Sequence, residues 1–218
     1  MVGALFTRLG GKGASYQVDV TDAGSVQDAA RDFAARFGTP DIVIANAGIS
    51  VGTSTERSDD LAAFRKVMDT NVYGMAATFQ PFIESMCERR NGTLVGIASV
   101  AGFRGLPGAG AYSASKAGAI TYLESLRAEL HPSGVSVVTV CPGYVRTPMT
   151  AVNRYRMPFI LEADEAARRI ARVISRKQRL AVIPWQMALV SCAFRSLPGW
   201  LYDRVFARAP RKPRNLIR

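Results

Sequence analysis

The stretch IASVAGFRGLPGAGAYSASKAGAI, residues 97–120, joins a short apolar run, a glycine-rich loop and an alanine-rich segment. The apolar run ends at Ser99, and the alanine-rich segment, which predicts a helix, begins near Tyr112. A strand followed by a loop and a helix is the repeating unit of α/β proteins. The stretch therefore predicts one such unit, with a hydroxyl at the end of its strand and a phenol at the start of its helix.

The same alternation runs along most of the chain. Apolar runs rich in β-formers are separated by stretches whose apolar residues recur every three or four positions, which is the spacing of a helix. Because these runs are apolar on both faces, they indicate parallel strands covered by helices on two sides. The sequence thus predicts a doubly wound parallel sheet in a three-layer α/β/α arrangement. The expected strands are residues 15–20, 41–47, 93–99, 135–141 and 179–184, and the expected helices are residues 25–37, 59–90, 112–130 and 163–175.

The composition is that of a globular protein with an uneven charge. Hydrophobic residues make up 48% and charged residues 21% of the 218 residues, which argues against disorder. The formal net charge is +11, and from residue 176 onward ten Lys or Arg face one Asp, so this end carries +9. We therefore divide the chain into an α/β domain over residues 1–184 and a basic, amphipathic tail over residues 185–218.

The tail leaves several partners open. Its basic residues alternate with large apolar ones such as Trp185 and Trp200. This mixture predicts contact with an anionic membrane surface, packing across a second subunit, or a cover over the substrate pocket. No recognition motif accompanies the charge, which argues against nucleic acid as a partner.

The sequence shows neither a secretion signal nor a membrane span. The first residues lack the basic, apolar and cleavage regions of a signal peptide. The longest apolar run, residues 181–194, is shorter than the roughly 20 residues that a spanning helix needs. The three cysteines form no CxxC or Cys/His cluster. We expect a cytoplasmic protein, with the inner face of a membrane as the alternative for its tail, and no metal site.

Residues suited to ligand binding follow several predicted strands. In a doubly wound sheet, ligands bind outside the carboxyl ends of the strands. Each residue taken singly is typical of an ordinary turn, but together they indicate a site. They are Asp19 after the first strand, Asn46, Ala47 and Gly48 after the second, Ser99 after the third, and Cys141, Pro142 and Gly143 after the fourth.

Tyr112 and Lys116 are four residues apart, which places them on one face of the predicted helix. A free phenol has a pKa near 10 and is a poor base at neutral pH. A neighbouring ammonium favours the phenolate and is expected to lower the pKa of Tyr112 by about 1–3. Tyr112 would then serve as a general acid/base for an alcohol or carbonyl group, and Ser99 could hold the same oxygen by a hydrogen bond.

These motifs resemble those of the short-chain dehydrogenases/reductases over about residues 4–184. The resemblance implies a Rossmann-like domain that uses NAD or NADP to oxidise a hydroxyl or reduce a carbonyl of a small substrate. An apolar substrate is indicated by the large side chains near the expected pocket, which are Phe103, Met149, Tyr155, Met157 and Phe159. The alternative is a cofactor-free binding or scaffold protein with a relic site. The matching motifs are Asp19-Val20, N-A-G at 46–48, N-V-Y-G at 71–74, Ser99, Y-S-A-S-K at 112–116 and P-G-Y-V-R-T at 142–147.

The resemblance also implies a role for each residue. Tyr112 is the acid/base, Ser99 contacts the substrate oxygen, and Lys116 stabilises the phenolate and contacts a cofactor ribose. Asn71 holds a water that relays protons through Lys116, unless it merely faces solvent. The implied cofactor contacts are Asp19 and Val20 at the adenine, Asn46, Ala47 and Gly48 at its ribose, and Pro142, Val145 and Thr147 at the nicotinamide. The helices 59–90 and 112–130 would form a homodimer or tetramer.

One part of the family pattern has no counterpart in these residues. The family begins with a strand, a TGxxxGxG turn, a helix and a second strand, whereas residues 1–11 match the helix that follows that second strand. We expect the sequence to be a fragment, or else a degenerate relative. The strand at 15–20 would then lack its neighbours, and the strand at 42–45 would gain an exposed edge.

Overall fold

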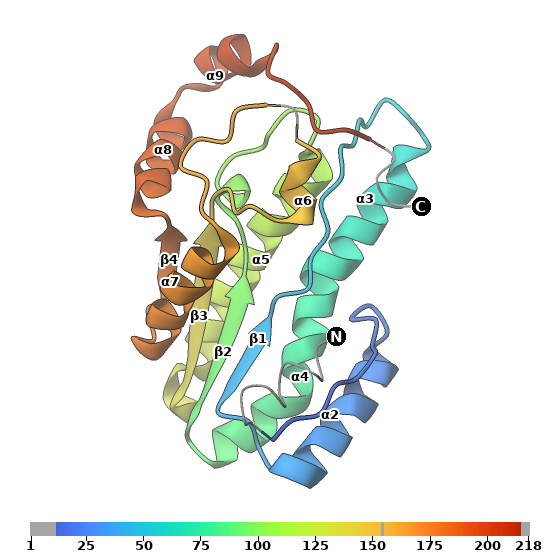
Figure 1. Ribbon diagram of the computed structural model, residues 1–218, viewed down its shortest axis with the longest axis vertical. Coiled ribbons are helices and arrows are strands. Elements are labelled where there is room, and N and C mark those ends of the chain that lie inside the picture. Colours follow the sequence, from blue (N-terminus) through green and yellow to red (C-terminus); the bar gives the residue numbers. More distant parts are fainter. Residues whose placement is uncertain (1–11, 154, 215–218) are drawn as a thin grey trace.

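The computed structural model describes residues 12–153 and 155–214. Its centre is a four-stranded parallel sheet in the order β1-β2-β3-β4 (Figure 1). The strands are β1 (Ile42–Ala45), β2 (Gly92–Ile97), β3 (Val135–Pro142) and β4 (Leu180–Ile183). In this register Ile44 lies opposite Val95, and Val95 lies opposite Val138. The predicted parallel α/β sheet is confirmed, with four of its five expected strands.

Helices cover both faces of the sheet. The core on one face joins α4 (Gly74–Glu88) and α5 (Gly110–Leu130) to the strands, and the core on the other face joins α7 (Ala163–Ser175) to them. Successive residues of a strand point to opposite faces. Leu94 accordingly belongs to the first core and Val95 to the second, and both are fully buried. This alternation is why β2 is buried along nearly its whole length.

The long helix predicted at 59–90 is present but carries an irregularity. It consists of α3 (Asp60–Met68), a π-helical turn (Asp69–Tyr73) and α4. A π-helical turn inserted in an α-helix is rare and occurs frequently at functional sites. Here it contains Asn71, which is fully buried. The remaining helical elements are α2 (Ala23–Phe37), α6 (Pro148–Ala151), α8 (Trp185–Ser196), α9 (Gly199–Phe206) and the short 3-10 turns Val100–Gly102 and His131–Ser133.

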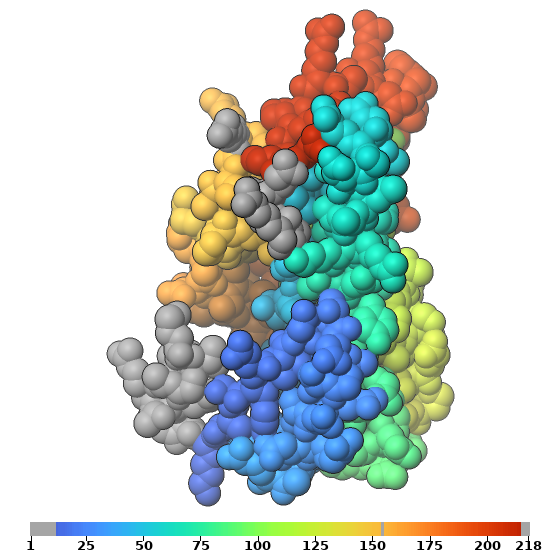
Figure 2. Space-filling model, turned by 90° about the vertical axis from the view of Figure 1, so that its right-hand side faces the viewer, coloured from blue at the N-terminus to red at the C-terminus, as the bar shows by residue number. Residues whose placement is uncertain are grey.

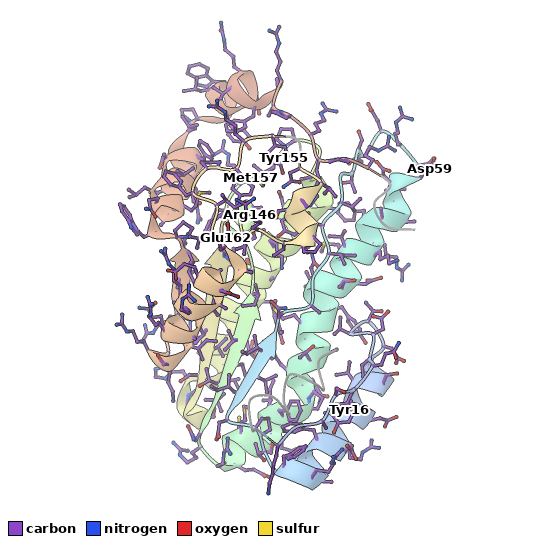
Figure 3. The ribbon with its side chains drawn as sticks, viewed as in Figure 1. Tyr16, Asp59, Arg146, Tyr155, Met157 and Glu162 are labelled. Carbon is purple, nitrogen blue, oxygen red and sulfur yellow. The ribbon has the colours of Figure 1, made fainter. Side chains whose placement is uncertain are left out.

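The strand expected at residues 15–20 is wrong. These residues form no strand; they run beside α2, where the Tyr16 hydroxyl donates to Asp32 (Figure 3). A strand needs a hydrogen-bonding neighbour, and among the described residues β1 pairs only with β2. Ile42 and Ile44 point to the same face of the sheet and are 48% and 47% exposed. The edge of β1 away from β2 has no neighbouring strand among the described residues, as expected. The helix matched to residues 1–11 lies outside the described residues.

The described part of the tail packs against the rest of the chain. After α8 and α9, the chain crosses the carboxyl end of the sheet and reaches the start of α3 (Figures 1 and 2). The Gly52 N–H donates to the Pro213 carbonyl at 3.0 Å. The Arg214 guanidinium donates two hydrogen bonds, at 2.7 and 2.8 Å, to the Asp60 carboxylate. We call residues 207–214 the C-terminal strap; of the three expectations for the tail, these contacts fit the cover over the pocket. Contact with an anionic membrane stays a prediction.

Candidate active site

Ser99 and Tyr112 meet at the carboxyl end of β2. Ser99 follows the strand and caps the turn Val100–Gly102, because its hydroxyl accepts a hydrogen bond from the Ala101 N–H at 3.2 Å. Tyr112 lies in the first turn of α5, and its side chain lies beside that of Ser99. A strand end and a helix start thus bring together two hydroxyls that are thirteen residues apart in the sequence.

The pKa of Tyr112 moves opposite to the expectation. Burial raises this pKa above the ordinary value of a phenol, and the neighbouring Ser99 side chain only partly opposes the increase. The Lys116 ammonium lies 5.8 Å from the centre of the Tyr112 ring. The predicted lowering by Lys116 is therefore wrong for this structure, because removal of the phenol from water outweighs the distant positive charge. Tyr112 is a protonated phenol at neutral pH.

Lys116 lies on the same face of α5, as its spacing predicts. It is 4% exposed, and its ammonium donates to the Ile97 carbonyl at 2.7 Å. Burial lowers its pKa to about 8, so the side chain is still mostly positive at neutral pH. A Cβ atom added to Gly48 would lie 3.5 Å from this ammonium. Because Gly48 has no side chain, the ammonium faces open space on that side.

Asn71 is hydrogen-bonded both to the segment after β1 and to α5. Its amide oxygen accepts from the Ile49 N–H at 2.8 Å, and its amide nitrogen donates to the Ile49 carbonyl at 3.0 Å and to the Ser115 hydroxyl at 2.9 Å. The solvent-facing alternative for Asn71 is therefore wrong. Both amide hydrogens are used, so a water on this side chain would have to donate to the amide oxygen. The proton relay stays a prediction.

A groove of about 590 Å³ runs along the carboxyl ends of the strands. It brings together eight of the ten predicted cofactor contacts, which come from three separate segments of the chain. These are Asn46, Ala47, Gly48, Tyr112, Lys116, Pro142, Val145 and Thr147.

The other two predicted cofactor contacts do not line this groove. The Asp19 carboxylate accepts hydrogen bonds from the N–H and hydroxyl of Thr21, and these lower its pKa. The Val20 side chain packs against Gly74, where a Cβ would come within 2.6 Å of it. The adenine contacts were predicted for the end of a strand, and residues 15–20 do not form one.

A second cavity, of about 100 Å³, adjoins the groove. The two spaces share Ser99, Tyr112, Gly143, Met149 and Thr150, so the hydroxyl pair forms part of the wall between them. Apolar and aromatic side chains dominate the rest of its lining, including Leu106, Tyr144 and Tyr155. Tyr155 comes from the loop between α6 and α7 and lies above the carboxyl ends of the strands (Figure 3).

Three polar residues of this cavity were missed by sequence reasoning. They are Ser50, Asn153 and Lys212. None belongs to a motif with a chemical signature, and Lys212 reaches Ser50 across 162 residues of sequence. The only hint in the sequence was the general suggestion that the tail covers the substrate pocket.

Three further observations describe the site and its surroundings: an exposed ion pair, a search for metal ligands and a search for membrane-spanning helices. At its rim Arg146 donates to Glu162 at 2.8 Å, and both side chains are more than 60% exposed (Figure 3). Within residues 12–153 and 155–214, no three His, Cys, Asp or Glu side chains cluster as a metal site would require. None of the described helices combines the length and the apolar character needed to cross a membrane.

Comparisons with known proteins agree with this geometry. A model of the family described as short chain dehydrogenase matches residues 3–157. An uncharacterized oxidoreductase of Myxococcus xanthus (strain DK1622) is 40% identical over 192 residues, which cover 88% of this chain and 76% of that protein. Dehydrogenase/reductase SDR family member 7B of Mus musculus is 31% identical over 208 residues, 90% of this chain, and this chain spans only 64% of that protein.

A solved structure shows the same fold. ElxO with NADP bound superposes with a TM-score of 0.67 at 22% identity, over 78% of this chain and 76% of its own. A family model that matches well over half of the residues, together with relatives more than 30% identical, settles the assignment: the chain belongs to the short-chain dehydrogenase/reductase family of oxidoreductases.

Proposed function

We propose that this chain transfers a hydride between NAD or NADP and the hydroxyl or carbonyl carbon of a small substrate. One observation carries the proposal. The side chains of Ser99 and Tyr112 line both the 590 Å³ groove and the smaller cavity. A cofactor in the groove and a substrate in the cavity would both reach these two hydroxyls, which is the arrangement that a hydride transfer with proton transfer requires.

The groove suits the nicotinamide half of a dinucleotide. It is elongated over several strand ends, and at Gly48 a Cβ would come within 3.3 Å of Asn71 and 3.5 Å of Lys116. Lys116 uses one donor on Ile97, which leaves others for ribose hydroxyls. Pro142, Val145 and Thr147 would hold the nicotinamide ring, which supplies or accepts the hydride. The NADP of the related fold in ElxO supports this assignment.

The side chains have distinct tasks in carbonyl reduction. Ser99 donates a hydrogen bond to the substrate oxygen and orients it. Tyr112 donates its proton to the same oxygen as negative charge develops there; its raised pKa keeps that proton in place at neutral pH. The Lys116 ammonium, 5.8 Å from the ring, then stabilises the phenolate that remains. In alcohol oxidation the proton moves in the opposite direction.

A second candidate is a cofactor-free binding protein that retains this site. It is favoured by the lining of the groove: the glycine-rich loop before α5 contributes none of its glycines to it, so the described part of the groove lacks a glycine-rich helix start, the usual site for a pyrophosphate. Titration of NADH and NADPH into the purified chain separates the two: no saturable binding with either nucleotide would favour the binding protein.

Substitution of Tyr112 tests the enzyme. Tyr112→Phe removes the proton donor but keeps the buried ring, so we expect turnover of small ketones at saturating NADPH or NADH to fall by about 10²–10⁴-fold. Cofactor affinity should hardly change. Tyr122→Phe, at a tyrosine of the same helix that lines neither the groove nor the small cavity, is the matched control and should keep full activity. Activity of Tyr112→Phe above a few per cent of the parent would exclude the proposed role.

A further inference from the structure

The small cavity contains a buried ammonium that the reaction described above does not use. Lys212, from the C-terminal strap, is only 9% exposed and lines the cavity together with Ser99 and Tyr112. Its ammonium donates to the Ser50 hydroxyl at 2.9 Å and to the Met149 carbonyl at 3.4 Å. Ser50 and Met149 themselves line the cavity, so the charged end of Lys212 lies at its wall.

This charge has no counterion among the described residues. Neither of its two acceptors is ionised, and no described carboxylate lies within 4.0 Å of it. Burial lowers the pKa of Lys212, as expected for an ammonium that has left water without gaining a negative partner. A lysine has three donor hydrogens, and the two acceptors leave one over. A buried charge is ordinarily paired, so this ammonium is suited to a ligand anion.

A second polar group of the cavity, the amide of Asn153, also has unused hydrogen-bonding capacity. Within residues 12–153 and 155–214, the buried amide oxygen of Asn153 has no hydrogen-bond partner, and its amide nitrogen contacts only the sulfur of Met157, at 3.5 Å. Buried polar atoms in folded proteins almost always have partners. Asn153 and Lys212 line the same cavity. An amide oxygen accepts hydrogen bonds, so it would be satisfied by a hydroxyl of a ligand, whereas the ammonium would be satisfied by an acceptor or an anion.

The strap holds Lys212 in a defined place. On one side of it, Pro213 accepts the hydrogen bond from Gly52; beyond that, Arg214 makes its two-pronged contact with Asp60, which is 5% exposed. The Lys212 backbone is packed so closely on Gly52 that a Cβ there would lie 2.2 Å from the Lys212 carbonyl oxygen. These contacts, made by Lys212 and by the two residues that follow it, fix its side chain far better than a free terminus could.

We propose that Lys212 binds a carboxylate of the substrate, so that this chain acts on short hydroxy or oxo acids in preference to their neutral analogues. This inference rests on the proposed function for the reacting end of the substrate, which Ser99 and Tyr112 would hold. A carboxylate fits better than a phosphate, because the cavity is small and offers one ammonium with no arginine in its lining.

A binding experiment tests the inference without turnover. Pentanoate and pentanamide have the same chain and differ in charge, and each is titrated into the full chain by calorimetry at fixed ionic strength. Hydrogen bonds to a charged group predict that pentanoate binds about tenfold or more tightly than pentanamide. Lys212→Met should abolish this preference and Lys212→Arg should retain part of it. Arg208→Met removes the same charge from an exposed position of the strap and should leave the preference unchanged.

A kinetic experiment completes the test. The ratio of kcat/KM for 4-oxopentanoate to that for its methyl ester should fall at least tenfold in Lys212→Met, with the loss mainly in KM for the acid. A merely structural lysine would lower both rates and leave the ratio unchanged, which would overturn the inference. An equal affinity of the parent chain for pentanoate and pentanamide would also overturn it. Lys212-dependent binding of pentanoate without turnover of any substrate would support the inference and refute the proposed function.

Discussion

The contact between Gly52 and the C-terminal strap predicts the effect of a single methyl group. In Gly52→Ala the new Cβ would lie 2.2 Å from the Lys212 carbonyl oxygen, 2.9 Å from the Pro213 carbonyl oxygen and 3.0 Å from the Lys212 carbonyl carbon. All three atoms belong to the backbone, so no side chain can rotate away. Ordinary contacts of this kind are 3.4 Å or longer, and the strap must therefore move outward by about 1 Å.

That displacement has two measurable consequences. The hydrogen bond from the Gly52 N–H to the Pro213 carbonyl, now 3.0 Å, would lengthen beyond hydrogen-bonding range, at a cost of about 1 kcal/mol. If exchange follows local opening of the strap, its amides should exchange about fivefold faster. Lys212 would move with the strap, and a shift of about 1 Å in a positioning group can reduce turnover as much as 100-fold.

Hydrogen–deuterium exchange of the peptides that contain residues 207–214 measures the first consequence directly. Brief trypsin treatment provides a second measure, because the strap contains Arg208 and Arg211. Gly199→Ala is the matched control, since a Cβ at Gly199 meets nothing within 4 Å among the described residues. Parental exchange and cleavage rates in Gly52→Ala would refute the packing of the strap on Gly52.

Two other predictions concern pH and the cofactor. The pKa of Asp60 is lowered by its hydrogen bonds from Arg214 and from the Ser54 N–H. This carboxylate therefore stabilises the docked strap at pH values above the ordinary pKa of about 4 and loses that effect as the pH falls through its own lower value. Amide hydrogen exchange in the strap, corrected for the intrinsic exchange rate at each pH, should accelerate as the pH is lowered below about 4. Asp60→Asn should show fast exchange at every pH. Asp59→Asn changes an exposed carboxylate and should match the parent. For the cofactor, the described groove contacts offer no glycine-rich helix start for the pyrophosphate. We expect the 218-residue chain to bind NADH and NADPH only weakly, and micromolar affinity by calorimetry would contradict this.

The parts of the fold that follow local patterns could be predicted from the sequence. The runs that became β1 to β4 are apolar on both faces, and a parallel sheet between helical layers requires this of each strand separately. Tyr112 and Lys116 share a helix face because they are four residues apart. Ser99 was expected in the site because it follows a strand, and the carboxyl ends of parallel strands meet at one edge.

Local patterns failed where the outcome depends on a distant neighbour. Residues 15–20 have the composition of a strand, but a strand forms only beside a partner. The pKa of Tyr112 was expected to fall because its helical neighbour is a lysine, whereas burial, which depends on the whole surrounding structure, raises it.

Lys212 shows most clearly the difference between what the local sequence predicts and what long-range packing decides. Nothing in its surrounding sequence distinguishes it from the other basic residues of the tail. It lies in the cavity because Gly52 and Asp60, more than 150 residues earlier, hold the strap that carries it. Spacing along the chain fixes which side chains share a face or an edge, because helices and strands have regular periods. Burial and long-range contacts exist only after packing, so they decide which charges lose their water and which surfaces meet.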